Sequence, residues 1–368
     1  MFDIAYLTLD SIQEGVGRSQ ILRPLEELSR RGVSIALITF EKSQPSKEII
    51  QRVRAAAIDW TFLPFEYSSL PTTRRMMDLA LHIPKAGLVH CRSDLPVATA
   101  LVRKEPFLWD VRSFWADARV ADGSLRNGSA RFRVVKRLEA MAYRKCAGFV
   151  TLSYAGRQQL VAQYGHPRVP NRVIPTCADT EVFAETPMPP GHPLRIVMSG
   201  SYNKLYDLNI VGEFVATLNR TSTVEVIWAR PQESRTTPPA YVSQVVAADD
   251  PDKLSKIIAS GHVGVSVLSP NTSSMMAAAV PTKIGEFLAC GRPVLVNPGL
   301  GDTKDLVAGG AGVDLYLHGL SEAADKVRLL TSSENTAARC RRIALQSFSL
   351  TGAVNQYLSL YDQILHKS

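Results

Sequence analysis

The alternation of short apolar runs with helical stretches constrains this chain more than any other feature. Apolar runs at 4–9, 33–40 and 87–91 have the length and composition of buried strands. The stretch 21–32 between the first two carries apolar residues at helical spacing and ends in basic residues and a glycine. Alternation of this kind predicts a parallel sheet covered by helices on both faces.

A proline-rich run divides the chain into two similar halves. Four prolines and a glycine fall within residues 186–193, where neither a helix nor a central strand continues. The strand–helix pattern then begins again at 195–218. We therefore expect an α/β protein with two Rossmann-like domains. The expected bounds are 1–186 for the first domain, 187–193 for the linker, 194–349 for the second domain, and about 350–368 for a C-terminal helix that packs back on the first domain.

Composition excludes several classes of protein. No apolar run reaches the roughly 18–20 residues of a membrane span, and the first residues lack the basic and apolar regions of a signal peptide. The five cysteines form no CxxC pair. We therefore expect reduced thiols, no zinc site and a cytoplasmic location.

Positive charge is concentrated in the first half. The chain carries a net charge of +8, and residues 1–190 account for +7 of it. A basic patch is expected there that includes Arg126, Arg131, Arg133, Lys136 and Arg137. Such a patch fits an anionic membrane surface or a phosphorylated substrate, or it is a solvated helix face. No nucleic-acid motif accompanies it, which disfavours nucleic acid as a partner.

A glycine-containing loop follows the first predicted strand. Gly15, Gly17 and Arg18 precede a helix, whose N-terminus offers free N–H groups to an anion. The loop lacks the full G-x-G-x-x-G spacing, and no acidic residue is suitably placed after the second strand. A dinucleotide-dependent dehydrogenase is therefore disfavoured.

Charged and aromatic residues gather at the end of a later predicted strand. Asp110 and Arg112 lie at its carboxyl end, and Trp115 and Asp117 follow. Ligands of open α/β sheets bind at this edge. Rings stack on sugar faces and charged groups bond hydroxyls or phosphates, so the segment predicts sugar or phosphate recognition. The alternative is a loop with a packed tryptophan and a surface ion pair.

The segment 280–294 predicts a short helix that binds a diphosphate. Lys283 lies in its first turn, next to Thr282, where a cation opposes the helix dipole at a cost of about a few tenths of a kcal/mol. That placement is explained if Lys283 and the free helix N–H groups bind a diphosphate together. Glu286 lies one turn further on the same face, within reach of ribose hydroxyls. The alternative is a surface helix with an ordinary Lys/Glu pair.

These segments together resemble family 4 of the retaining GT-B glycosyltransferases, especially bacterial polysaccharide enzymes. The run 280–294 is similar to the family helix that cradles a nucleotide-sugar. Further segments resemble the other family motifs in the same order: 17–20, 89–93, 110–117, 173–183 and 299–302. The resemblance spans roughly residues 5–365. It implies a GT-B fold, with two parallel sheets facing a central cleft.

The resemblance also implies roles for particular residues. Thr282 and Lys283 would lie at the diphosphate, and Glu286 would bond the ribose. The other donor-site residues it implies are Gly200 and Lys204 from the second domain, and Gly17 and Arg18 from the first. The candidate catalytic residues are Arg112, Asp110, Asp117 and His90.

The implied activity is that of a hexosyl- or glycosyltransferase of the EC 2.4 class. It moves a sugar from a nucleotide-diphosphate sugar to a saccharide or lipid-linked acceptor, with retention, in surface polysaccharide or glycolipid synthesis. The nucleotide-sugar is a substrate, and we expect no cofactor and no metal. Peripheral attachment at the inner face of the cell membrane fits the positive charge.

Two alternatives stay open. One is a non-catalytic sugar- or nucleotide-binding scaffold, because Ala278 stands where the broader family often has a glutamate and Arg112 stands near the position of its usual histidine. The other is a GT-B sugar epimerase.

Overall fold

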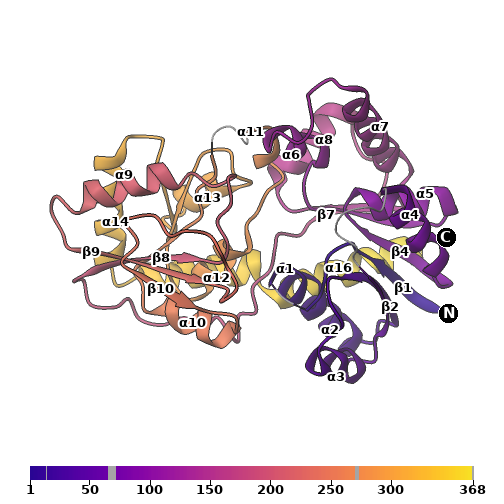
Figure 1. Cartoon of the computed structure of the whole chain (residues 1–368), viewed down its shortest axis with the longest axis horizontal. Helices are drawn as coiled ribbons and strands as arrows, with labels where there is room; N and C mark the ends of the chain where they lie inside the picture. The colour runs from indigo at the N-terminus through magenta and orange to yellow at the C-terminus, as the bar shows by residue number, and fades with distance from the viewer. Residues whose placement is uncertain (14, 65–71, 270–272, 367–368) are drawn as a thin grey trace. The chain divides into compact units, whose positions relative to one another are not determined.

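The computed structural model describes residues 1–13, 15–64, 72–269 and 273–366. The chain folds into two compact units. Unit 1 comprises Met1–Pro175 and Ala353–Ser368, and unit 2 comprises Thr176–Gly352. Each unit contains a parallel sheet with helices packed around it, as the alternating sequence pattern predicts (Figure 1).

The sheet of unit 1 has its topological switch point at its centre. In the described part of the unit, seven parallel strands follow the order β3-β2-β1-β4-β5-β6-β7. Successive strands are therefore added to one side of β1 up to β3 and to its other side from β4 onward, and crevices for ligands form at the carboxyl ends of strands at such a point. The strands are β1 Phe2–Leu7, β2 Ile35–Glu41, β3 Asp59–Pro64, β4 Ala86–Arg92, β5 Phe107–Val111, β6 Gly148–Thr151 and β7 Asn171–Val173.

Helices connect the strands of unit 1. α4 packs against α5, and α5 packs against α7, so that these three form one layer. A π-helical turn at Arg18–Leu22 separates the short α1 from α2. The helices are α1 Gly15–Gly17, α2 Arg23–Arg30, α3 Lys47–Ala55, α4 Thr72–His82, α5 Asp94–Arg103, α6 Trp115–Ala121, α7 Ala130–Lys145 and α8 Tyr154–Tyr164.

The last helix of the chain, α16 (Leu350–Leu365), completes unit 1 from the far end of the sequence. Two glycines allow it to lie close to the sheet. A Cβ atom on Gly87 would lie 2.9 Å from the side chain of Leu365, and one on Gly148 would lie 2.7 Å from that of Ile364. Strand residues without side chains therefore leave the space that α16 fills.

Unit 2 repeats the architecture with a smaller sheet. Among its described residues, six parallel strands follow the order β10-β9-β8-β11-β12-β13. The strands are β8 Leu194–Ser199, β9 Val224–Arg230, β10 Gln244–Ala247, β11 Val263–Val265, β12 Val294–Val296 and β13 Gly312–Asp314. The helices are α9 Leu208–Leu218, α10 Pro251–Ala259, α11 Ser273–Met276, α12 Thr282–Ala289, α13 Thr303–Ala308, α14 Leu320–Ser332 and α15 Thr336–Ile343, which a π-helical turn at Ala344–Phe348 follows.

The proline-rich run packs within unit 2, which begins at Thr176 and therefore includes the segment 187–193 expected as a linker. Arg292 holds the start of this run. Its guanidinium donates to the carbonyl oxygens of Thr186, Pro187 and Ala259 at 2.6–3.0 Å, and to the Thr186 hydroxyl at 2.6 Å. The arginine is 1% exposed. Several hydrogen bonds to one buried cation therefore anchor the segment to the β11–β12 side of the unit.

In the described residues, no helix combines the length and the apolar character needed to cross a membrane.

Candidate functional site

The candidate donor residues of unit 2 lie on α12 and on the loop that follows β8. The residue before α12, Pro281, contributes no side-chain cap to the helix. The first N–H groups of an α-helix have no partner within the helix. Together with the helix dipole, they make this end of α12 a favourable place for an anion.

Lys283, in the first turn of α12, is buried without a hydrogen-bond partner for its ammonium group in the described structure. The Nζ atom lies 3.7 Å from the ring centroid of Tyr202 and 4.3 Å from that of Tyr206. Both tyrosines belong to the loop after β8. Burial lowers the pKa of Lys283 to about 7, and Glu286 opposes that shift. Two aromatic faces thus hold a lysine that is close to losing its proton.

Glu286 lies one turn after Lys283 and is half-buried. Burial raises the pKa of its carboxyl group to about 7, while nearby Lys283 acts to lower it. Over the described residues, no ion pair within 4.0 Å joins the two side chains. An ordinary surface Lys/Glu pair, the alternative left open by the sequence, does not fit this arrangement. Two ionisable groups are instead kept apart at the start of a helix.

The loop after β8 also contains Gly200 and Lys204. Gly200 has a φ of +71°, which only glycine adopts readily, and its carbonyl oxygen accepts a hydrogen bond of 2.9 Å from the indole of Trp228. Lys204 is exposed, and Thr282 is half-buried. All five donor-site residues predicted in the second domain therefore come from α12 and this loop.

In unit 1, Asp110 lies at the centre of a buried polar network. Its carboxylate, at the end of β5, accepts hydrogen bonds of 2.9 and 2.7 Å from Arg112 and lies 3.2 Å from His90 Nε2. Arg92, at the end of β4, brings a second guanidinium to 4.0 Å. Burial raises the pKa of Asp110. The opposing effect of Arg112 and His90 is larger, so that the pKa lies well below its usual range. Asp110 is therefore ionised.

His90 has both ring nitrogens occupied. Its Nδ1 lies 2.7 Å from the hydroxyl of Tyr361 on α16, and its Nε2 faces Asp110. Burial lowers the pKa of His90, which is 1% exposed. A neutral imidazole held at both nitrogens positions its neighbours and does not present a free base.

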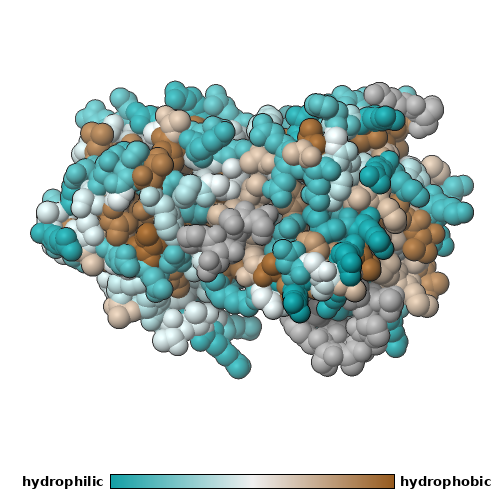
Figure 2. Space-filling model, turned by 90° about the horizontal axis from the view of Figure 1, so that it is seen from above, coloured by the Kyte–Doolittle hydropathy of each residue, from teal (hydrophilic) through white to brown (hydrophobic). Residues whose placement is uncertain are grey.

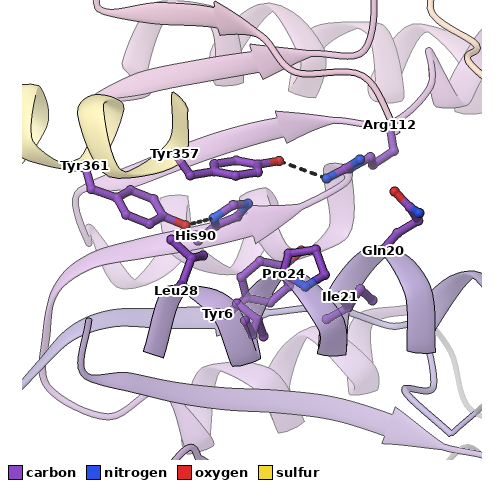
Figure 3. A pocket seen from close by; sticks show the side chains of 10 residues that line it. Tyr6, Gln20, Ile21, Pro24, Leu28, His90, Arg112, Tyr357 and Tyr361 are labelled. Atoms are coloured by element: carbon purple, nitrogen blue, oxygen red, sulfur yellow. Dashed lines mark hydrogen bonds between the residues drawn. The ribbon is translucent and has the colours of Figure 1, made fainter. Parts of the chain in front are cut away.

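Arg112 lines a small cavity together with His90 of the same network (Figure 3). A hydrogen bond of 3.0 Å joins it to the hydroxyl of Tyr357 on α16. The cavity has a volume of about 10 Å³, close to the space of one water molecule. It is lined by Tyr6, Gln20, Ile21, Pro24, Leu25, Leu28, His90, Arg112, Tyr357 and Tyr361.

The other predicted residues of unit 1 have separate surroundings. Asp117, in the first turn of α6, pairs with Lys136 at 3.2 Å. Gly17 is buried, and a Cβ atom there would lie 1.7 Å from the carbonyl oxygen of Ser11. Arg18 forms an ion pair with Glu48. The structure therefore brings His90, Asp110 and Arg112 together and places Asp117 in a different cluster.

The sequence contains an Asp-x-Asp pattern at Asp250 and Asp252, which the prediction of no metal left out. Carboxylates close together can hold a divalent cation. Asp250 instead caps α10, because its side chain accepts a hydrogen bond of 3.0 Å from the Lys253 N–H.

Known proteins resemble this chain in part of its sequence and in its fold. Residues 19–182, slightly less than half of the chain, match the model of Glycosyltransferase Family 4. Sucrose-phosphate synthase from Thermosynechococcus elongatus is similar in structure, with a TM-score of 0.73 and 13% identity over 100% of both chains. Anabaena HepE in complex with UDP-glucose gives a TM-score of 0.67 and 12% identity over 98% of this chain and 100% of that one. A search of curated proteins found no match.

The fold predicted from the sequence, GT-B, is thereby confirmed. The predicted resemblance to glycosyltransferase family 4 is confirmed by the family match over residues 19–182. Together they support a glycosyltransferase. A putative UDP-N-acetylglucosamine 2-epimerase from Listeria monocytogenes shares the fold at a lower TM-score of 0.61, with 11% identity over 100% of this chain and 97% of that one.

Several residues of these clusters were missed by sequence reasoning. Tyr202 and Tyr206 surround Lys283, and Tyr357 and Tyr361 bond the network of unit 1. The sequence predicts only that both α16 tyrosines belong to a terminal helix at about 350–368. Their four-residue spacing places both on one face of α16, but nothing in the sequence says which polar groups they meet.

Proposed function

We propose that this protein transfers a sugar from a nucleotide-diphosphate sugar to a saccharide or lipid-linked acceptor, with retention of configuration, in surface polysaccharide or glycolipid synthesis. The observation that supports this most is Lys283, a buried lysine without a hydrogen-bond partner at the uncapped start of α12. A lysine so placed is poorly stabilised until an anion arrives. The diphosphate of the donor is such an anion.

The chemistry of transfer explains this arrangement. As the bond between the sugar and the diphosphate breaks, negative charge develops on the leaving phosphate oxygens. Lys283 and the N–H groups at the start of α12 are already oriented toward such charge, so little reorganisation is needed during the reaction. Lys204 and Gly200, on the loop after β8, add a second cation and a close backbone approach. Glu286 accepts hydrogen bonds from the ribose hydroxyls.

On the acceptor side, Arg112 is the group that meets substrate. Asp110 and His90 position it, because both are buried and hydrogen-bonded to the network rather than exposed. No obligatory protein base is invoked, since the departing phosphate can take the acceptor proton. Asp117, paired with Lys136, orients the acceptor from α6.

The donor site is tested by calorimetry. UDP and UDP-glucose, which are present in the Anabaena HepE structures, are suitable first probes. Lys283→Ala and Glu286→Ala should each weaken nucleotide binding by about 1.5–3 kcal/mol, the range for hydrogen bonds to charged groups. Lys304→Ala removes an exposed lysine of α13 and serves as the matched control. Unchanged affinity in both site variants, with the fold intact, would reject the assignment.

A panel of nucleotide-sugars separates an enzyme from a scaffold. A transferase without its acceptor should hydrolyse its donor slowly, and the panel also identifies the sugar and the base. A scaffold binds a nucleotide-sugar and leaves it intact. An epimerase returns an isomer of the donor and releases no free sugar. Detection of that isomer would favour the epimerase.

Catalysis is proposed to need no metal, because Lys283, Lys204 and the start of α12 supply the positive charge at the diphosphate. Donor hydrolysis should therefore continue in EDTA. Loss of turnover in EDTA that Mn²⁺ restores would contradict this, and Asp250 and Asp252 would be the first residues to substitute.

A further inference from the structure

Three helices of unit 1 expose an uncommon mixture of side chains. α4 packs against α5 and α5 against α7, so that the three helices form one layer (Figure 1). Five large apolar side chains of this layer are 43–77% exposed: Met77, Leu81, Val102, Val134 and Met141. Scattered exposed apolar residues are ordinary, but five on one layer of adjoining helices need an explanation. We refer to this outer surface of α4, α5 and α7 as the basic–apolar face.

The exposed side of α7 is positively charged throughout its length. Its basic residues Arg131, Arg133, Arg137, Arg144 and Lys145 are all exposed. The acid of this helix, Glu139, is buried and accepts hydrogen bonds from Lys136 and Tyr164. The positive charges on the exposed side of α7 therefore have no negative counterpart on the same helix.

Two residues expected in the basic patch have other contacts. Lys136 is largely buried and binds Asp117 and Glu139. The guanidinium of Arg131 lies over the ring of Trp115 at 5.9 Å. The surface charge continues instead along Arg133, Arg137 and Arg144, and onto Lys104 at the end of α5, where the neighbouring Arg103 lies 3.8 Å from Glu105.

The apolar residues alternate with this charge on α7. Val134 and Met141 are separated by seven residues, so they lie on the same side of the helix, and Arg137 and Arg144 lie between and beyond them. Figure 2 shows hydrophobic atoms, in brown, among hydrophilic ones on the surface of unit 1 at the right of the view. Basic side chains with interspersed apolar ones are the composition of a surface that lies in a lipid headgroup region.

We propose that the basic–apolar face binds an anionic lipid bilayer, with the arginines and lysines at the headgroups and the five apolar side chains inserted between them. A soluble polyanion would use the charges but gain nothing from the exposed Leu81, Val102 and Met141. This inference deepens the proposed function and rests on it in one respect, because the lipid-linked acceptor that a bilayer would carry is part of that function. Binding itself is measured without donor or acceptor.

Vesicle co-sedimentation of the full chain tests the proposal. The probes are vesicles of phosphatidylcholine alone and vesicles with one third phosphatidylglycerol. The protein should bind only the anionic vesicles and dissociate at high salt. Arg133→Gln, Arg137→Gln and Arg144→Gln combined should weaken binding about a hundredfold, since each basic residue contributes about fivefold.

The apolar residues distinguish a bilayer from a polyanion. Leu81→Ser, Val102→Ser and Met141→Ser combined should weaken vesicle binding by about tenfold or more, and leave binding to dextran sulfate unchanged. Leu317→Ser with Leu329→Ser removes two exposed leucines from unit 2. This control should change neither vesicle binding nor dextran sulfate binding. Failure of the unaltered protein to bind anionic vesicles at low salt overturns the proposal, and so does vesicle binding that ignores the apolar variant. UDP calorimetry on the same samples shows separately whether the donor-site assignment survives.

Discussion

Lys283 combines two properties that rarely occur together in a side chain kept only for stability. It is 6% exposed, and its ammonium group has no hydrogen-bond partner among the residues that the structure describes. The faces of Tyr202 and Tyr206 compensate in part for the lost hydration. What remains is a destabilising charge, which is common where a ligand completes a site.

Lys283→Met should therefore raise the thermal midpoint of the protein by several degrees at pH 7 and weaken nucleotide binding. The pKa of Lys283 is about 7 in the folded protein, and its ordinary value is 10.5. Between pH 7 and pH 10.5 the unfolded chain therefore binds more protons at this side chain than the folded chain does. The stability of the unaltered protein thus rises from pH 7 to pH 10.5, and the advantage of the variant shrinks over that interval. Melting curves from pH 6 to pH 10 measure this. A variant less stable at pH 7 would show that the ammonium group is stabilised by its surroundings.

The hydrogen bond between Tyr361 and His90 should contribute mainly to the stability of unit 1. Tyr361→Phe leaves Nδ1 of a buried imidazole without a partner, which costs about 1–3 kcal/mol. Denaturant unfolding should show that loss, while UDP affinity stays unchanged. In a double-mutant cycle with His90→Phe, the second substitution should cost less than it does alone. Additive losses would mean that the two side chains are not coupled.

At the scale of elements, periodicity located the well-ordered strands of both sheets. The apolar runs at 33–40 and 87–91 became β2 and β4, shifted by one or two residues. β10 and β13 were not predicted. β10 (Gln244–Ala247) is a partly exposed edge strand, and β13 (Gly312–Asp314) has a single large apolar residue between a glycine and an aspartate, so neither shows the apolar run that marks a buried strand. The π-helical turn at Arg18–Leu22 also has no signature in a single sequence.

Some residues of the candidate site can likewise be predicted from the sequence, and others cannot. Local motifs identified Lys283, Glu286, Asp110 and Arg112, because each lies next to a strand end or helix start that the sequence marks. The tyrosine partners come from other segments, so only the fold brings them into contact. Burial is equally hidden, since residues 280–294 predict a helix but do not predict that Lys283 will be buried on it.

The position of α12 depends on a glycine in the strand beneath it. A Cβ atom on Gly264 of β11 would lie 2.3–2.5 Å from ring atoms of Phe287, which is fully buried. Gly264→Ala should displace α12, lower the thermal midpoint and weaken UDP binding, although neither residue meets the ligand. Adding Phe287→Leu should recover part of both losses by making room for the methyl group. If the double variant binds UDP no better than Gly264→Ala, the displacement of α12 is not the cause.

At the scale of the whole molecule, the chain leaves unit 1 at Pro175 and returns to it at Ala353. The returning helix supplies Tyr357 and Tyr361 to the network around Asp110, and its Ile364 and Leu365 fill the space left by two glycines of the sheet. Unit 1 is therefore not complete until α16 has been made. Its stability depends on contacts between segments separated by more than 240 positions.

Truncation after residue 352 should unfold or loosen unit 1 and spare unit 2. The cut removes Tyr357 and Tyr361, whose rings pack against His90, and so uncovers the buried His90 and the Tyr6 ring that packs on it. Unit 1 should then lose its cooperative melting transition and bind a dye for exposed apolar surface. Calorimetry with UDP should show that the donor site of unit 2 still binds. A chain ending at residue 366, which keeps all of α16, is the matched control and should behave like the full chain. A truncated protein in which unit 1 still melts cooperatively at an unchanged temperature would show that α16 is dispensable, and the polar network would then owe its geometry to the strand ends alone.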